Sequence, residues 1–87
     1  MTNVILYTTT LCPFCIRAKR LLDAKYVSYI EIDVSEDLGM RQQMVERANG
    51  AQTVPQIFIG DQHVGGSDEL VALENAGELD KWLEGAA

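Results

Sequence analysis

The chain has 87 residues, which is enough for one small domain and too few for a second. Its composition, 47 % hydrophobic and 23 % charged, is that of a globular protein and excludes a disordered or collagen-like chain. Thirteen acidic against seven basic residues give a net charge of −6, which argues against a nucleic-acid-binding stripe and against an anchor on an anionic membrane. We therefore expect a single domain, residues 1–87, that folds alone.

The first third of the chain is predicted to form a strand, a helix and a second strand. Residues 4–7 are a short apolar run that favours a buried strand, without the basic region and long apolar core of a signal peptide. From Cys12 the apolar residues follow helical spacing, and Pro13 suits the first turn. Residues 27–34 alternate apolar and polar side chains, which indicates a strand. This order predicts a right-handed βαβ unit with parallel strands.

A second helix and a hairpin are expected next. Ser35 is expected to cap the helix, and Gly50 to stop it. Residues 56–59 and 63–64 flank the turn formers at 60–62 and predict two short antiparallel strands. The predicted sheet is therefore mixed.

The last part of the chain is expected to be helical. Ser67 is expected to cap a third helix, which Gly77 breaks, and residues 79–83 to add a last turn before a frayed tail at 85–87. The order βαβαββα predicts an α/β fold in which helices flank a four-stranded mixed sheet. No stretch approaches the roughly 18 apolar residues of a membrane span.

The two cysteines lie at the start of the first predicted helix. Their spacing, Cys12 to Cys15, lets two thiols close a small disulfide ring. A helix N-terminus stabilises a thiolate through free N–H groups and the positive end of the helix dipole, and Cys12 lies at that end. Cys15, one turn further, is expected to be more shielded and closer to an ordinary thiol. We expect Cys12 to attack a disulfide and Cys15 to resolve the mixed disulfide.

Zinc binding and structural inertness are the alternatives for this motif. A closed zinc site needs four ligands, but the chain has no other cysteine and a single histidine, His63, in the predicted hairpin. We expect no metal, since Cys-x-x-Cys beside a βαβ pattern is the redox arrangement. Two buried, inert thiols remain the alternative. Two cysteines also exclude a disulfide-dense secreted scaffold, and we expect a cytoplasmic protein.

Three motifs in order resemble the small dithiol glutaredoxins. They are Tyr7-Thr8 with Cys12-Pro13-Phe14-Cys15, then residues 53–59 (TVPQIFI), then residues 65–70 (GGSDEL). The resemblance runs from about residue 3 to residue 84. It implies a thioredoxin-like fold and glutathione as reductant and co-substrate. It also implies a cis peptide bond before Pro55, which sequence alone would not support, because only about 5–6 % of X-Pro bonds are cis.

The resemblance implies a glutathione site that begins beside Cys12. The cis bond would turn the backbone of Val54 outward, where it can pair with the glutathione cysteine as an added strand does. Thr53 would border that contact, next to Pro55.

At the γ-glutamyl end, Gly66 would allow close backbone approach, and the free N–H groups of Ser67 and Asp68 would bind the carboxylate. The Asp68 side chain would take the amine. A plain helix cap and an acid that complements the helix dipole would explain Ser67 and Asp68 equally well in isolation.

The glycine end of glutathione has weaker expected partners. Gln42 aligns with a polar or basic residue of the family, although a solvated helix face explains a lone glutamine equally well. Thr9 stands where the family often has a lysine, so a cation that favours the thiolate and the bound anion is missing. We expect weaker glutathione binding than in lysine-bearing relatives. Arg17, Lys19 and Arg20 are expected to replace part of that charge.

These features predict a glutathione-dependent thiol-disulfide oxidoreductase. Its expected partners are glutathione, disulfide-containing or glutathionylated proteins and, through glutathione, glutathione reductase; we expect a monomer. One alternative is an electron donor reduced by thioredoxin reductase, against which Asp68 and residues 53–55 argue. Another is an iron–sulfur carrier that uses Cys12 of two chains and two glutathiones, which Pro13 disfavours. The third is an interaction module without redox turnover.

Overall fold

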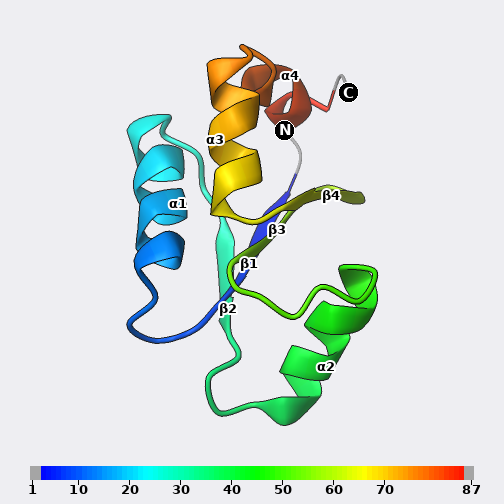
Figure 1. Ribbon diagram of the computed structural model, residues 1–87. Coiled ribbons are helices and arrows are strands. Elements are labelled where there is room, and N and C mark those ends of the chain that lie inside the picture. The colour runs from blue at the N-terminus through cyan, green and yellow to red at the C-terminus, as the bar shows by residue number, and fades with distance from the viewer. Residues whose placement is uncertain (1–2, 86–87) are drawn as a thin grey trace.

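The computed structural model describes residues 3–85 and contains the predicted elements in the predicted order (Figure 1). The strands are β1 (Val4–Thr8), β2 (Ile30–Asp33), β3 (Gln56–Ile59) and β4 (Gln62–Gly65). The helices are α1 (Pro13–Ala24), α2 (Leu38–Arg47), α3 (Ser67–Asn75) and α4 (Leu79–Leu83). Helix α4 is the extra turn expected at the end of the chain, whereas residues 86–87 of the expected frayed tail lie outside the described residues.

The four strands form one mixed sheet in the order β2-β1-β3-β4. Strand β1 runs parallel to β2 and antiparallel to β3, and β3 and β4 form the predicted hairpin. Leu6 in β1 lies opposite Ile57 in β3. Because β1 is an inner strand, the loop that follows its C-terminal end, which carries the cysteines, begins near the middle of the sheet.

Alternate residues of the inner strands face two separate cores. Leu6 and Ile57 pack with residues of α1, α3 and α4 on one face. Tyr7 and Phe58 pack with Met44 of α2 on the other face. Figure 1 shows α1 and α3 side by side on the first face and α2 alone across the sheet. Since each buried apolar side chain contributes about 1.5–3 kcal/mol, both faces hold the sheet in place.

Both predicted serine caps were wrong. Asp37 caps α2, and its side chain accepts the Met40 N–H at 2.9 Å. Ser35 instead accepts the N–H of Thr10 at 2.8 Å, a tertiary bond that ties the start of α2 to the cysteine loop. Helix α3 has Gly66 as its N-cap, and Ser67 is its first residue.

Strand β2 is also shorter than the predicted 27–34. The chain leaves α1 through Tyr26 in the left-handed region, at φ 58°, and the Val27 N–H donates to Leu22 O at 3.0 Å. This bond ties the start of the predicted strand to the helix end instead of to a neighbouring strand. Gly50, at φ 96°, follows α2 as predicted. None of the helices within residues 3–85 is long and apolar enough to cross a membrane.

Candidate active site

The Cys12 thiol is itself the N-terminal cap of α1. After β1 the chain turns at Leu11, which has φ 59° and is 91 % exposed, and reaches Cys12 in extended conformation. The Cys12 Sγ then accepts the N–H of Cys15 at 3.2 Å. Pro13, at the first position of the helix, has no N–H to satisfy. This is the arrangement in which a helix N-terminus stabilises a thiolate.

Cys15 lies behind Cys12 and is only 1 % exposed. Its burial, together with the hydrogen bond to Cys12, raises the pKa of the Cys15 thiol to about 12. The shielding expected for Cys15 is therefore present, but the expectation of a nearly ordinary thiol was wrong, because desolvation penalises the thiolate strongly. Both cysteines are free thiols in the structure. The two thiols thus differ sharply in exposure.

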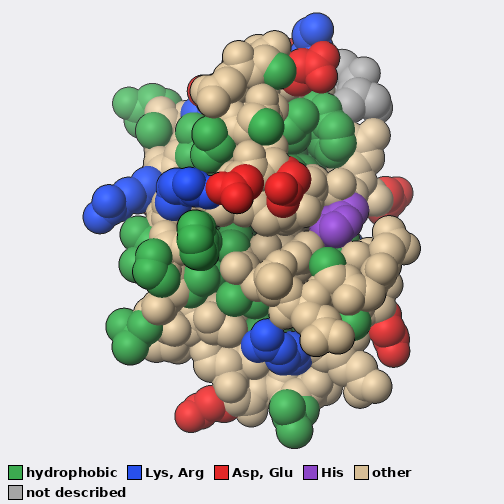
Figure 2. Space-filling view, viewed as in Figure 1, with side chains coloured by type: hydrophobic (Ala, Val, Ile, Leu, Met, Phe, Trp, Pro, Cys, Tyr) green, Lys and Arg blue, Asp and Glu red, His purple; other side chains and the backbone are tan. Residues whose placement is uncertain are grey.

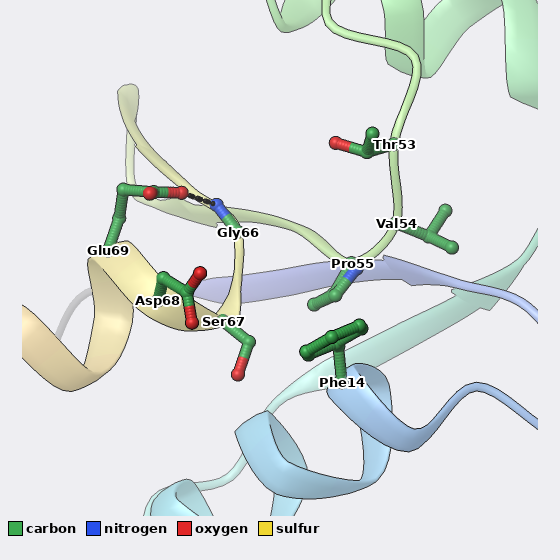
Figure 3. A pocket seen from close by; sticks show the side chains of 8 residues that line it. All are labelled: Phe14, Thr53, Val54, Pro55, Gly66, Ser67, Asp68 and Glu69. Atoms are coloured by element: carbon green, nitrogen blue, oxygen red, sulfur yellow. Dashed lines mark hydrogen bonds between the residues drawn. The ribbon is translucent and has the colours of Figure 1, made fainter.

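The Val54–Pro55 peptide bond is cis, as the resemblance implied. The Cys12 thiol lies 3.9 Å from the carbonyl oxygen of Val54, to which it donates. Figure 3 shows the Thr53 side chain pointing across the pocket toward α3, while the Val54 side chain points the other way. The thiol and the backbone carbonyl of Val54 are therefore neighbours although 42 positions separate them in the chain.

Gln56 holds this loop from behind, a role that the sequence reasoning missed. Its side chain, in a residue only 2 % exposed, donates to the carbonyl oxygen of Thr53 at 2.9 Å and to the Thr53 hydroxyl at 3.2 Å. Its carbonyl oxygen lies 2.6 Å from Nε2 of His63. A polar residue at the start of an otherwise apolar strand was the available signal, since a buried amide needs partners.

A pocket of about 350 Å³ opens between the start of α1, the cis-proline loop and the start of α3 (Figure 3). Its lining residues are Phe14, Thr53, Val54, Pro55, Gly66, Ser67, Asp68 and Glu69. Six of the predicted binding residues thus meet around one hollow. Glu69 accepts the Gly66 N–H at 2.7 Å, and the first intrahelical bond of α3 runs from Leu70 to Gly66. The N–H groups of Ser67 and Asp68 lie in the first turn, where a helix offers no internal acceptor.

The two residues before α3, Gly65 and Gly66, leave little room for a side chain. Gly65 has φ 114°, and a Cβ there would lie 2.9 Å from Oε1 of Glu69. A Cβ on Gly66 would approach the same oxygen to 3.2 Å and the carbonyl oxygen of Pro55 to 3.5 Å. Gly66 therefore permits close backbone approach, and the nearest groups are the Glu69 side chain and the cis-proline loop.

Of the predicted site residues, Cys12 and Cys15 lie outside the lining of this pocket, and two of the predicted glutathione-binding residues lie away from it. Gln42 lies with Leu38, Arg41, Val45 and Gln52 around a separate hollow on α2. Thr9 is half-buried between β1 and the cysteine loop, outside the residues that line either hollow. Within residues 3–85, no group of three or more His, Cys, Asp or Glu side chains is arranged to hold a metal ion.

Two of the three cations on α1 are engaged in ion pairs. Arg17 donates through Nε to the Ser67 hydroxyl at 2.6 Å, and through Nη2 it pairs with Asp68. Lys19 pairs with Glu31 of β2 at 3.0 Å. Arg17 was expected only as diffuse positive charge, but the structure brings it to the γ-glutamyl end of the predicted site.

Comparison with known proteins gives a consistent result. The family model described as Glutaredoxin matches residues 4–64. The chain is 51 % identical to Glutaredoxin of Pseudomonas aeruginosa, over 95 % of this chain and 98 % of that protein. It is 48 % identical to Glutaredoxin 3 of Escherichia coli, over 97 % of this chain and the whole of that protein.

Solved structures share the whole fold. The solution structure of a glutaredoxin from Brucella melitensis is 49 % identical, with a TM-score of 0.87 over all of this chain and 94 % of that one. A buckwheat glutaredoxin–glutathione complex is 26 % identical, with a TM-score of 0.87 over 98 % of this chain and 79 % of that one. The predicted thioredoxin-like fold with a four-stranded mixed sheet is confirmed.

Proposed function

The chain belongs to the glutaredoxin family and is a glutathione-dependent thiol-disulfide oxidoreductase with a Cys-x-x-Cys active site, and on this basis we propose that Cys12 is its nucleophile and Cys15 its resolving thiol. The observation that carries this assignment is the contrast in exposure: Cys12 caps α1, is partly exposed and contacts Val54 of the pocket lining, while Cys15 is buried behind it. A thiolate must reach the disulfide sulfur in line, and only Cys12 is open to such an approach.

Deglutathionylation requires only Cys12. The Cys12 thiolate attacks the glutathione sulfur of a glutathionylated protein, so that a Cys12–glutathione disulfide forms as the target's S–S bond breaks. The target thiolate leaves and takes a proton from solvent. A second glutathione thiolate then attacks the bound glutathione sulfur, which regenerates Cys12 and releases glutathione disulfide. One free glutathione is thus consumed for each protein thiol released, and the other half of the glutathione disulfide comes from the substrate.

Reduction of a protein disulfide requires both cysteines. Cys12 attacks one sulfur and forms a mixed disulfide with the substrate protein, releasing its other sulfur as a thiol. Cys15 then loses its proton, attacks Cys12 and displaces the reduced protein. Two glutathione molecules reduce the resulting Cys12–Cys15 disulfide. The raised pKa of Cys15 keeps this second thiol protonated in the reduced enzyme.

We propose that glutathione occupies the pocket between α1 and α3. Its cysteine would pair with the backbone of Val54, with Thr53 and Pro55 beside it, and its γ-glutamyl group would reach Ser67 and Asp68 next to Gly66. The lining of the 350 Å³ pocket and the 3.9 Å contact between the Cys12 thiol and the carbonyl oxygen of Val54 support this placement. Gln42 and Thr9 stay proposed for the glycine end, although neither lines the pocket.

The proposal extends to the setting of the protein. Residues 1–87 would form one glutaredoxin domain, working as a monomer without a resident metal in the reducing cytoplasm. The single sheet with a core on each face supports one domain. Glutathione reductase would recycle the oxidised glutathione, and disulfide-containing or glutathionylated proteins would be the substrates.

The test is reduction of a small glutathione mixed disulfide, coupled to glutathione, glutathione reductase and NADPH. Wild type and Cys15→Ser should turn over, and Cys12→Ser should not. Activity of Cys12→Ser would overturn the assignment of the nucleophile. Activity with thioredoxin reductase, but none with glutathione, would overturn the proposed reductant.

A further inference from the structure

Arg17 contacts three residues that line the pocket. Its Nε donates to the Ser67 hydroxyl at 2.6 Å, its Nη2 pairs with Asp68, and its Cζ lies 5.5 Å from the centre of the Phe14 ring. Arg17 itself belongs to the cysteine-bearing helix α1, and both polar partners belong to α3. Figure 2 shows basic and acidic side chains meeting across the middle of this face, with hydrophobic side chains gathered beside them.

The fold gains little from this ion pair. The Arg17 side chain is 45 % exposed and that of Asp68 is 79 % exposed. Ion pairs so open to water add little to stability, because solvent screens the attraction and two side chains lose freedom. The pair is therefore available to exchange partners with a charged ligand at small cost.

The γ-glutamyl end of glutathione carries a carboxylate and an ammonium group on the same carbon. A site for such a head group needs a positive and a negative group side by side. Asp68 supplies the negative charge, and the first turn of α3 supplies only partial positive charges through its N–H groups. Arg17 supplies a full positive charge in contact with Asp68, with a planar fork that suits a carboxylate.

We propose that Arg17 is a specificity-determining residue of the glutathione site, an inference that rests on the proposed function. Arg17 binds the α-carboxylate of the γ-glutamyl group while Asp68 binds its ammonium. Each member of the ion pair thereby exchanges one partner for another, and neither charge is left alone. The pocket consequently selects thiols that carry a free α-amino-acid head group. A head group without its carboxylate offers Arg17 no negative group to bind in exchange for Asp68, so the Arg17–Asp68 pair stays closed.

A double-mutant cycle tests this assignment by combining a substitution of Arg17 with a change in the substrate. The two substrates are a peptide disulfide of glutathione and the same disulfide with the γ-glutamyl α-carboxylate converted to an amide. We expect wild type to lose about tenfold in kcat/KM on the amide, equivalent to about 1.4 kcal/mol. Arg17→Gln should lose about tenfold on the glutathione substrate and nothing further on the amide. Arg17→Lys should recover part of the loss, because it restores the charge without the fork.

Lys81→Gln is the control, because Lys81 is an exposed cation on α4 that does not line the pocket. It should behave as wild type on both substrates. The rate at which iodoacetamide alkylates Cys12 should be equal in wild type and Arg17→Gln, which separates head-group binding from activation of the thiol.

An equal loss on both substrates in Arg17→Gln, or no loss on either, would overturn the role of Arg17. A slower alkylation of Cys12 that accounts for the whole loss would overturn it as well. The proposed function fails differently: wild type would then reduce a cysteine–peptide disulfide as fast as the glutathione–peptide disulfide. That comparison does not involve Arg17, so the two failures are distinguishable.

Discussion

The burial of Cys15 predicts a large difference in chemical reactivity between the two thiols. The structure raises the pKa of Cys15 from the ordinary 9.0 to about 12, first through burial and second through the hydrogen bond to Cys12. Three pKa units correspond to about a thousandfold smaller thiolate fraction at any pH below 9. Because alkylation proceeds through the thiolate, Cys15 should react about a thousandfold more slowly than an unhindered thiol, and its 1 % exposure slows it further.

Iodoacetamide labelling between pH 6 and pH 9, followed by peptide mapping, measures this difference. Reduced wild type should be modified at Cys12 alone, whereas both cysteines should react after unfolding in guanidinium chloride. Cys12→Ser isolates the cause, since it changes the hydrogen bond but leaves Cys15 buried. Because burial is the first cause of the raised pKa, Cys15 should stay unreactive in this variant.

The reasoning would be refuted if Cys15 in folded Cys12→Ser reacted within tenfold of its rate in the unfolded chain. Such a result would mean that burial does not control this thiol. A second consequence concerns pH: the resolving step, followed by release of a reduced protein substrate, should accelerate with pH up to about pH 10 without a plateau. A plateau near neutral pH would contradict the raised pKa.

Three further changes have defined outcomes. Thr9→Lys should lower the KM for glutathione several-fold at low ionic strength and less at high salt, because a surface cation attracts an anionic ligand through a screened field; an unchanged KM would contradict the notion of a missing cation. Gln56→Leu removes two hydrogen bonds to Thr53, so it should lower the urea midpoint by an amount equivalent to about 1–3 kcal/mol. It should also raise the KM for glutathione, because Thr53 borders the proposed site. A change in stability alone would show that Gln56 does not position the loop. Glu31→Gln should lower the free energy of unfolding, measured in urea, by less than about 1 kcal/mol at pH 7 and by a smaller amount at pH 3. The hydrogen bond from Thr8, and then Lys19, lowers the pKa of Glu31 below 4.5, so its contribution exists above that value and disappears as pH falls through the lower folded pKa; an equal cost at both pH values would refute this linkage.

The order of the elements could be predicted because the hydrophobic period changes at clear positions. The apolar run before Cys12 and the helical spacing after it place a strand–helix boundary within a few residues. Both cysteines were placed correctly for the same reason, since a helix start and a Pro at its first position define the local geometry. Local sequence therefore accounts for the part of the site that lies within one turn of α1.

The choice among neighbouring capping residues could not be predicted. Ser35 and Asp37 are both good N-caps, and the structure decides between them because the Ser35 hydroxyl accepts a bond from Thr10, 25 positions earlier. Gln56 was missed for a similar reason: its partners Thr53 and His63 come together only when the hairpin and the cis-proline loop pack. Partner choice is a tertiary property, whereas helix and strand periodicity is local.

The cis bond at Pro55 belongs to a third category. Local sequence does not distinguish it from the far commoner trans form, and only the resemblance to a known family implied it. Neither the local sequence nor the family resemblance predicted the pairing of Arg17 with Asp68. The sequence shows the charge of Arg17 but not which acidic residue lies next to it in the fold.

The wide chain separation within the pocket has a consequence for synthesis and quality control. The Cys12–Val54 contact spans 42 positions, and the Arg17–Asp68 pair spans 51. A nascent chain that has already exposed both thiols therefore still lacks the half of the pocket that α3 supplies. Glutathione would recognise only the finished protein, and at a hundred times its Kd it would stabilise that state over incomplete ones by about 2.7 kcal/mol. On the proposed placement of glutathione, the co-substrate would also be a ligand that favours completion of the fold.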